Sequence, residues 1–311
     1  MPKVAILGAG NVATAAATFL AERNLADLVL IDVVNYGLAA GKAVDLAAAG
    51  PLRGSSARIH ATDRIEALAG ARVVVNTAGV PRKPGMDRMD LLKTNAAIAR
   101  RLARGVATHA PDAMVVNVAN PLDVICQVFL QTTGFPRERV VGMAGALDSA
   151  RLRTFIADAL DCDPRDVAAL VLGGHGDRMV PLVRTATVAG VPVSELLSAE
   201  ALEHLVRRTR QAGAEVVGLL KTGSAFTSTG AAVCAMVEPL LTGRARMVPA
   251  SAYLQGEYGL RDLFLGVPVL LGRHGVERIV ELALTDAERG ALQRSADEVR
   301  KGLDALESLN A

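Results

Sequence analysis

The sequence has no tryptophan, few other aromatic residues and nearly balanced charge, and these shortages exclude several classes of protein. Phe, Tyr and Trp make up 3% of the 311 residues, and 34 Lys and Arg face 32 Asp and Glu. A nucleic-acid-binding surface usually combines a basic patch with aromatic side chains that stack on bases. We therefore expect no nucleic-acid partner.

Long apolar runs are also missing, although 51% of the residues are hydrophobic. Apolar runs such as residues 73–75 and 267–271 fall far short of the roughly 20 residues that span a bilayer. The N-terminus carries one Lys and leads directly into a strand-like run, without the regions of a signal peptide. The sequence thus predicts a cytoplasmic protein with no membrane partner.

The sequence has only three cysteines, and their spacing follows no known disulfide or metal-binding motif. Cys126, Cys162 and Cys234 lie far apart and form neither a CxxC pair nor a cluster with metal-ligand spacing. We expect three free thiols, no disulfide framework and no metal site.

The first half alternates short apolar runs with Ala-rich helical stretches. Strands that alternate with helical crossovers form a parallel, doubly wound α/β sheet of the Rossmann type, so residues 1–145 are predicted to be a dinucleotide-binding domain. The expected strands are residues 3–7, 28–32, 73–77, 114–118 and 140–142, and the expected helices are residues 12–23, 38–49, 63–68 and 89–109.

The second half, residues 146–311, is predicted to be a mixed α+β substrate domain that ends in an amphipathic helix. The expected helices are residues 147–160, 199–220, 228–241 and 286–309, and the expected strands lie near residues 167–172, 185–188, 246–253 and 264–271.

A glycine motif follows the first predicted strand. It reads G-x-G-x-x-A and consists of Gly8, Ala9, Gly10, Asn11, Val12 and Ala13. Gly8 permits a tight turn, and Gly10 lets the backbone approach a pyrophosphate at the start of a helix. Asp32 ends the second strand at the offset where an acid accepts from the ribose 2′-hydroxyl, which favours NAD over NADP. The alternative is a plain strand–turn–helix whose glycines serve only the turn.

His175 is the sharpest feature of the second half, because it stands between glycines in the segment GGHGD, residues 173–177. An isolated His is often structural, but flanking glycines would leave the imidazole face open. An imidazole exchanges protons near neutral pH and needs a carboxylate to fix its tautomer, and Asp148 is the candidate.

Two arginines and an asparagine lie beside the predicted sheet edge where ligands bind. Arg82 and Arg88 belong to a Pro- and Gly-containing loop after the third strand, and Asn120 precedes Pro121 after the fourth. Arg82 and Arg88 are either ligand contacts or part of a solvated basic loop, and Asn120 is either a site residue or a turn former.

The whole chain resembles the lactate/malate dehydrogenases. The matching segments, in order over about three quarters of the chain, are residues 8–13, Asp32, and residues 78–85 (AGVPRKPG), 90–95 (DLLKTN), 120–123 (NPLD), 147–151 (LDSAR), 173–177 (GGHGD) and 221–225 (KTGSA). Each segment alone is weakly specific, but the ordered set is highly specific.

The resemblance implies a malate/oxaloacetate reaction with NAD as cofactor. His175 would be the proton donor and acceptor, oriented by Asp148, and Arg151 would pair with the substrate carboxylate beside the reacting carbon. Arg88 would polarise the carbonyl, and Arg82 would bind the distal carboxylate, where lactate-specific members have Gln.

The resemblance also implies further contacts and assembly. Asn120 would hydrogen-bond the reacting oxygen, and Asn95 with the backbone of Val118, Ala119 and Asn120 would line the nicotinamide. A homodimer or homotetramer is expected, with residues 16–23 and 199–220 as apolar contact faces. Arg178 departs from the family pattern, which suggests that it lowers the pKa of His175.

Three competing interpretations are weaker. A lactate or other 2-hydroxyacid dehydrogenase would not be expected to carry Arg82. A short-chain dehydrogenase needs Lys four residues after a Tyr, and none of Tyr36, Tyr253 and Tyr258 has one. A non-catalytic NAD sensor would be expected to have lost catalytic groups that are all present here.

Overall fold

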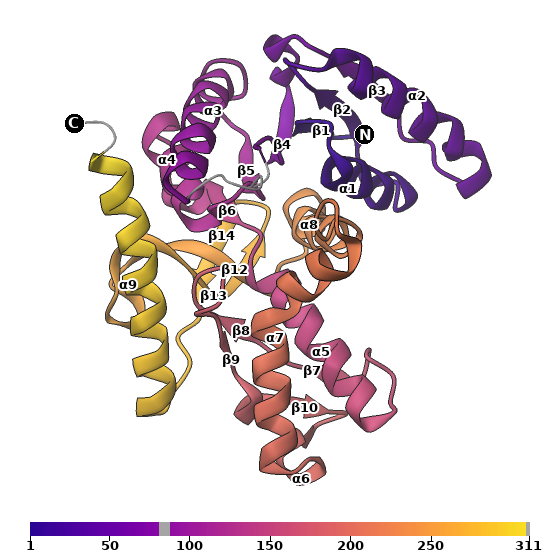
Figure 1. The fold of residues 1–311 in the computed structure, drawn as a ribbon. Helices are drawn as coiled ribbons and strands as arrows, with labels where there is room; N and C mark the ends of the chain where they lie inside the picture. The colour runs from indigo at the N-terminus through magenta and orange to yellow at the C-terminus, as the bar shows by residue number, and fades with distance from the viewer. Residues whose placement is uncertain (81–87, 309–311) are drawn as a thin grey trace.

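Parallel strands alternate with helices through the first half of the chain, which confirms the predicted fold class (Figure 1). The computed structural model describes residues 1–80 and 88–308. The strands are β1 (Lys3–Leu7), β2 (Asp27–Ile31), β3 (Ile59–Thr62), β4 (Ala71–Asn76), β5 (Met114–Asn117) and β6 (Val140–Gly142). The α-helices are α1 (Asn11–Glu22), α2 (Tyr36–Arg53), α3 (Arg88–His109) and α4 (Leu122–Thr133), with 3-10 helices η1 (Ile65–Leu68) and η2 (Arg137–Arg139).

β1 lies at the centre of this sheet, between β2 and β4, and pairs in parallel with both. Its side chains alternate between two cores: Val4 and Ile6 belong to one, and Ala5 and Leu7 to the other. Both faces are therefore covered, which explains why the strand is apolar throughout. The chain reverses its winding direction between β1 and β4, and ligands bind at such a switch point.

The second half contributes a helical lobe, small sheets and a long C-terminal helix (Figure 1). Its helices are α5 (Gly145–Leu160), α6 (Val193–Leu196), α7 (Ala199–Leu220), α8 (Thr227–Thr242) and α9 (Asp286–Ser308), with η3 (Val183–Thr185) and η4 (Glu257–Gly259). Its strands are β7 (Val167–Ala168), β8 (Val171–Leu172), β9 (Val180–Pro181), β10 (Thr187–Val188), β11 (Val191–Pro192), β12 (Arg246–Gln255), β13 (Arg261–Gly272) and β14 (Gly275–Ile279).

The three longest of these strands extend the first sheet instead of forming one of their own. β12 pairs antiparallel with β6 through Ser251 and Gly142, which gives a nine-stranded order of β14-β13-β12-β6-β5-β4-β1-β2-β3. This pairing covers the edge of β6, whose free N–H and C=O groups would otherwise be exposed. The sheet crosses the predicted boundary at residue 145, and the division into two domains stays a prediction.

Several predicted elements differ in detail from the structure. The strand expected near residues 167–172 is two short strands, β7 and β8, which belong to different small sheets. Only residues 187–188 of the expected strand 185–188 pair as a strand, because Thr185 belongs to η3. The expected helix 63–68 is the 3-10 helix η1, and α2 runs beyond residues 38–49 in both directions.

α1 packs closely on α8, which brings the two halves of the chain together (Figure 1). A Cβ atom on Gly230 of α8 would lie 2.6 Å from the Cβ of Ala15 and 2.6 Å from the backbone N of Ala16. Only glycine allows this approach. Among the described residues, no helix combines the length and apolar character needed to cross a membrane.

Candidate active site

The glycine turn between β1 and α1 is shaped for close backbone approach. Gly8 has φ +90°, and a Cβ there would lie 3.1 Å from both Cα of Ala78 and Oγ1 of Thr77. Gly10 caps α1 in an extended conformation, and nothing lies within 4 Å of the position its Cβ would occupy. No side chain caps this helix N-terminus. The first N–H groups of α1, from Asn11, Val12 and Ala13, are therefore suited to bind an anion.

Asp32 links the glycine turn to the end of β2 by hydrogen bonds. Its Oδ2 accepts the backbone N–H of Ala9 at 3.0 Å, and its Oδ1 accepts those of Val34 and Asn35 at 3.1 and 2.9 Å. A carboxylate at this place repels a 2′-phosphate and accepts from a ribose hydroxyl. The residues predicted to bind a dinucleotide thus come together, and their geometry fits NAD.

Asn95 of α3 joins the loops that follow β4 and β5. Its side chain is 3% exposed, accepts the N–H of Val80 at 2.8 Å, and donates to the carbonyl of Asn120 at 2.7 Å. The predicted nicotinamide-lining segment is thereby held in place, with Val118 and Ala119 buried. Asn120 itself is exposed, and its peptide bond to Pro121 is cis.

A buried asparagine pair, which sequence reasoning missed, supports the same edge. Asn76 and Asn117 are opposite each other at the ends of β4 and β5, and Nδ2 of Asn76 donates to Oδ1 of Asn117 at 2.8 Å. Nδ2 of Asn117 donates to the carbonyl of Ala119 at 3.1 Å. The available signal was an amide residue at the end of each of two apolar strands.

His175 and Asp148 meet as predicted. Nδ1 of the imidazole lies 2.9 Å from Oδ2 of Asp148, which projects from the first turn of α5. The side chain of Asp148 is 2% exposed and that of His175 is 19% exposed. The negative charge of Asp148 is the main cause that raises the pKa of His175 above its usual value, against the opposing effect of burial.

Arg151 stands one helical turn after Asp148 and joins this group. Its Nη1 lies 3.3 Å from Oδ1 of Asp148, so each carboxylate oxygen faces a different side chain. The side chain of Arg151 is 13% exposed. Its positive charge lowers the pKa of His175, in opposition to Asp148.

The glycines around His175 do not all serve the purpose expected from the sequence. Gly173 and Gly174 are buried, and a Cβ on them would lie 2.7 Å from Oγ of Ser295 and 2.9 Å from Cγ2 of Val299, respectively. These two glycines allow tight packing against α9, and only Gly176 borders open space. The expectation that the glycines simply expose the imidazole was therefore wrong for two of the three.

A cleft of about 360 Å³ opens beside the His175 loop. It lies between α3, α4, this loop and α9. Its lining includes Pro121, Asp123, His175, Arg178, Ser295 and Lys301. Arg178 is not among the main causes of the shift in the pKa of His175, so its suggested lowering of that pKa stays a prediction.

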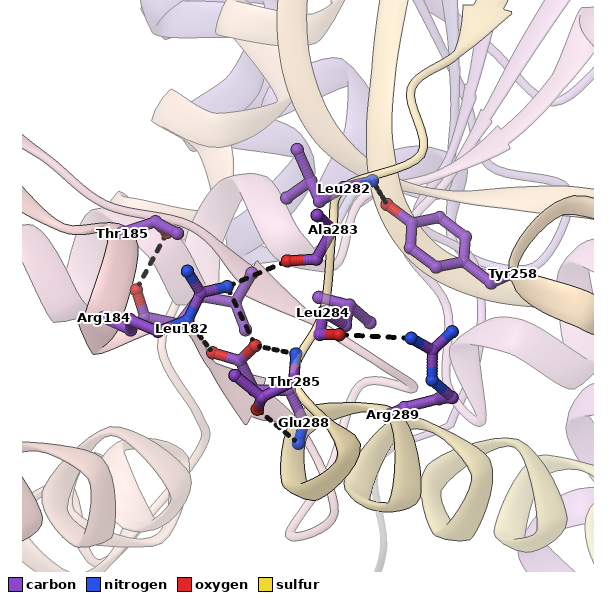
Figure 2. A network of polar contacts seen from close by, with 10 residues as sticks. All are labelled: Leu182, Arg184, Thr185, Tyr258, Leu282, Ala283, Leu284, Thr285, Glu288 and Arg289. Carbon is purple, nitrogen blue, oxygen red and sulfur yellow. Dashed lines mark hydrogen bonds and ion pairs between the residues drawn. The ribbon is translucent and has the colours of Figure 1, made fainter.

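A network of hydrogen bonds and an ion pair fixes the N-terminus of α9 (Figure 2). Thr285 and Glu288 form a capping box: the Glu288 carboxylate accepts the N–H of Thr285 at 2.8 Å, and Thr285 Oγ1 accepts that of Glu288 at 3.2 Å. Arg184, in η3, makes a two-pronged ion pair with Glu288 at 3.1 and 3.0 Å.

The two loop arginines are not placed by the structure. Arg82 lies outside the described residues, and Arg88 is the first residue of α3 with its side chain outside the described part. Within the described part, no group of three or more His, Cys, Asp or Glu residues has an arrangement that holds a metal ion.

Comparison with known proteins identifies the family. The NAD binding domain of lactate/malate dehydrogenase matches residues 2–142, and the lactate/malate dehydrogenase alpha/beta C-terminal domain matches residues 145–309. The chain belongs to the lactate/malate dehydrogenase family. It is an NAD-dependent oxidoreductase, and NAD is its cofactor.

Relatives in this family include both substrate types. The chain is 50% identical over 307 residues to a malate dehydrogenase of Thermomicrobium roseum, covering 99% of both chains. The malate dehydrogenase structure from Salinibacter ruber has a TM-score of 0.95 at 42% identity, covering 99% of this chain and 98% of that one. A lactate dehydrogenase structure from Eimeria maxima with NADH and oxamate has a TM-score of 0.96 at 37% identity, covering 99% of this chain and 95% of that one.

Proposed function

We propose that the protein interconverts malate and oxaloacetate by reversible hydride transfer, with His175 as the proton donor and acceptor. The observation that carries the proposal is the imidazole held at 2.9 Å by buried Asp148, with Arg151 on the other oxygen of that carboxylate. This arrangement provides a proton carrier beside a cation that pairs with a substrate carboxylate.

The proton step follows from the contact between His175 and Asp148. Because Asp148 engages Nδ1, we assign the proton exchanged with the substrate to Nε2. In the direction of reduction, the charged imidazole donates to the carbonyl oxygen of oxaloacetate and becomes neutral. When bound, NADH supplies the hydride to the adjacent carbon. In the reverse direction, the neutral imidazole accepts the proton of the malate hydroxyl.

Arginine side chains would bind the carboxylates at both ends of the substrate. Arg151 would pair with the carboxylate beside the reacting carbon, and Arg82 with the distal carboxylate. Arg88 would polarise the carbonyl, and Asn120 would hydrogen-bond the reacting oxygen. Pyruvate lacks the distal carboxylate and would leave the charge of Arg82 enclosed without a counter-charge. Pyruvate is therefore disfavoured as a substrate.

The substrate is tested by comparing NADH oxidation with oxaloacetate and with pyruvate. Fold similarity does not separate the two, because relatives of both kinds match equally well. We expect kcat/KM for oxaloacetate to exceed that for pyruvate by at least about 100-fold, and Arg82→Gln to reduce this ratio by at least about tenfold. Arg244→Gln, at an exposed position, is the control. Equal rates with both substrates would refute the proposal.

We further propose a cytoplasmic homo-oligomer. The suggested contact face at residues 16–23 needs correction, because Ala16, Ala17 and Leu20 are fully buried within the chain. The C-terminal end of α7 remains a candidate, since Val217, Leu219 and Leu220 are exposed. Sedimentation of the wild type and of Leu219→Glu tests whether this end of α7 supports self-association.

A further inference from the structure

Asp123 is a buried carboxylate that contacts the His175 loop from α4, whereas Asp148 contacts it from α5. It is the second residue of α4 and is 6% exposed. Its Oδ1 accepts the hydroxyl of Ser251, in β12, at 2.6 Å, and its Oδ2 accepts the backbone N–H of His175 at 3.1 Å. One side chain thus joins α4, the central sheet and the loop that carries the imidazole.

Three successive backbone N–H groups of this loop are held by three different elements. Gly173 donates to the carbonyl of Gly266 in β13 at 2.8 Å, and Gly174 donates to Oγ of Ser295 in α9 at 2.9 Å. His175 donates to Asp123. A backbone fixed at three consecutive positions has little freedom, and the third contact is the one at the imidazole-bearing residue itself.

Two opposing effects act on the charge of the Asp123 carboxyl. It lies in the first turn of α4, where the helix dipole stabilises an anion, although burial raises the pKa of its carboxyl. Its negative charge also helps to raise the pKa of His175. Among the residues that the structure describes, the charged groups that face His175 or its cleft are Asp148 and Arg151 of α5, Asp123 of α4, Asp177 and Arg178 of the loop, and Glu298 and Lys301 of α9.

We propose that Asp123 is a positioning residue for His175: its charged carboxylate fixes the backbone of the imidazole-bearing residue while Asp148 fixes the ring. This inference rests on the proposed role of His175 in proton transfer. A substrate oxygen must lie within hydrogen-bond reach of Nε2, and small displacements of a catalytic group reduce the rate strongly.

Two substitutions separate the geometric role of Asp123 from its charge. Asp123→Asn keeps an oxygen for the N–H of His175 and offers an amide N–H to Ser251, but removes the charge. Asp123→Ala removes both contacts. The matched control is Asp27→Asn, which removes another buried carboxylate at the start of β2, in a part of the sheet away from His175.

The readouts are kcat and KM for oxaloacetate across pH, and the titration of His175 followed by NMR of the histidine ring protons. The chain has only five histidines, and a spectrum of His175→Gln assigns the signal. For Asp123→Asn we expect the His175 pKa and the alkaline limb of the kcat profile to move to lower pH, with KM within about twofold. For Asp123→Ala we expect kcat to fall by about 10- to 100-fold, with partial rescue by Asn at acidic pH.

Each outcome decides between positioning and a merely structural role. An Asp123→Asn protein with an unchanged His175 titration and pH profile would overturn the proposal, as would an equal shift in Asp27→Asn or full kcat in Asp123→Ala. If Asp123→Ala fails to fold, the His175 titration and pH profile of Asp123→Asn are sufficient to test the proposal. Full activity in His175→Gln would instead refute the proposed function, so the two failures are distinguishable.

Discussion

Nδ1 of His175 lies 2.9 Å from Oδ2 of Asp148, and the same carboxylate accepts from Arg151 through its other oxygen at 3.3 Å. One buried carboxylate thus contacts both the His175 imidazole and the Arg151 guanidinium, and Asp148 and Arg151 have opposite effects on the pKa of His175. Asp148 is the main cause that raises the pKa of His175, and burial and Arg151 lower it, so the balance of these effects sets the pH at which the imidazole gains its proton.

Replacing Asp148 with Asn tests this balance. Because the carboxylate raises the pKa of His175 in the folded protein, its removal lowers that pKa. In the proposed mechanism, reduction of oxaloacetate needs the charged imidazole, so kcat/KM should fall at a lower pH than in the wild type, and by roughly 100-fold or more at pH 7.5. Steady-state rates from pH 5 to 9 provide the measurement, and an unchanged alkaline limb would contradict the assignment.

The same pKa shift affects stability. A folded-state pKa above the unfolded value means that the charged pair stabilises the fold below the unfolded pKa of about 6.5. This stabilisation is lost as the pH rises through the raised folded-state pKa. Urea denaturation should therefore show that the stability gap between wild type and Asp148→Asn is larger at pH 6 than at pH 9.

Replacing Asp32 with Ser should relax the preference for NADH. Without the carboxylate, the repulsion of a 2′-phosphate disappears, and the ratio of kcat/KM for NADH over NADPH should fall by at least about tenfold. The affinity for NADH itself should also decrease, because the N–H of Ala9 loses its acceptor. Fluorescence titration with both cofactors measures this, and an unaltered preference would show that Asp32 does not discriminate.

Gly230→Ala probes the close contact of α8 with α1. The added methyl would press on the backbone of Ala16, so we expect a loss of about 1–3 kcal/mol in the free energy of unfolding and weaker NADH binding. Gly41→Ala in α2, where nothing lies within 4 Å, is the matched control and should stabilise the protein by about 0.5–1 kcal/mol. Equal effects of the two substitutions would rule out steric packing as the cause.

Asp27→Asn should weaken the fold in a pH-dependent way. The hydrogen bond from the Arg58 side chain is the main cause that lowers the pKa of Asp27 to about 2 from its usual 3.8. A lowered pKa stabilises the fold above pH 3.8 and ceases to do so as the pH falls through about 2. Because the Arg58 side chain is 82% exposed, we expect a loss of only about 1 kcal/mol at pH 7. The difference should shrink towards pH 3 in urea titrations, and a constant difference would disprove this origin.

The sequence predicts the first half of the fold well because its signals are local. A few neighbouring residues are enough to predict each of these features: the apolar strands β1, β2 and β4, the glycine turn, and the helix after it. The antiparallel pairing of β12 with β6 joins Ser251 to Gly142 across more than 100 residues, and no local pattern indicates it. The split of residues 167–172 into two strands similarly depends on distant partners.

The site shows the same limit. The sequence predicts that Asp148 meets His175, and the structure places them together. It does not reveal why Gly173 and Gly174 are glycines, because the reason is contact with Ser295 and Val299 of α9, more than 100 residues later. Asp123 was visible only as one acid in the NPLD segment, and its contacts with Ser251 and His175 required the fold.

The most direct test is a single turnover of His175→Gln. The variant, saturated with NADH, is mixed with oxaloacetate, and the loss of NADH absorbance is followed in a stopped-flow instrument. NADH affinity, measured separately by fluorescence, should remain that of the wild type. We expect a rate of NADH oxidation that is lower by roughly 100- to 10,000-fold, because the proposed proton donor is absent. A wild-type rate in this variant would contradict the proposed role of His175.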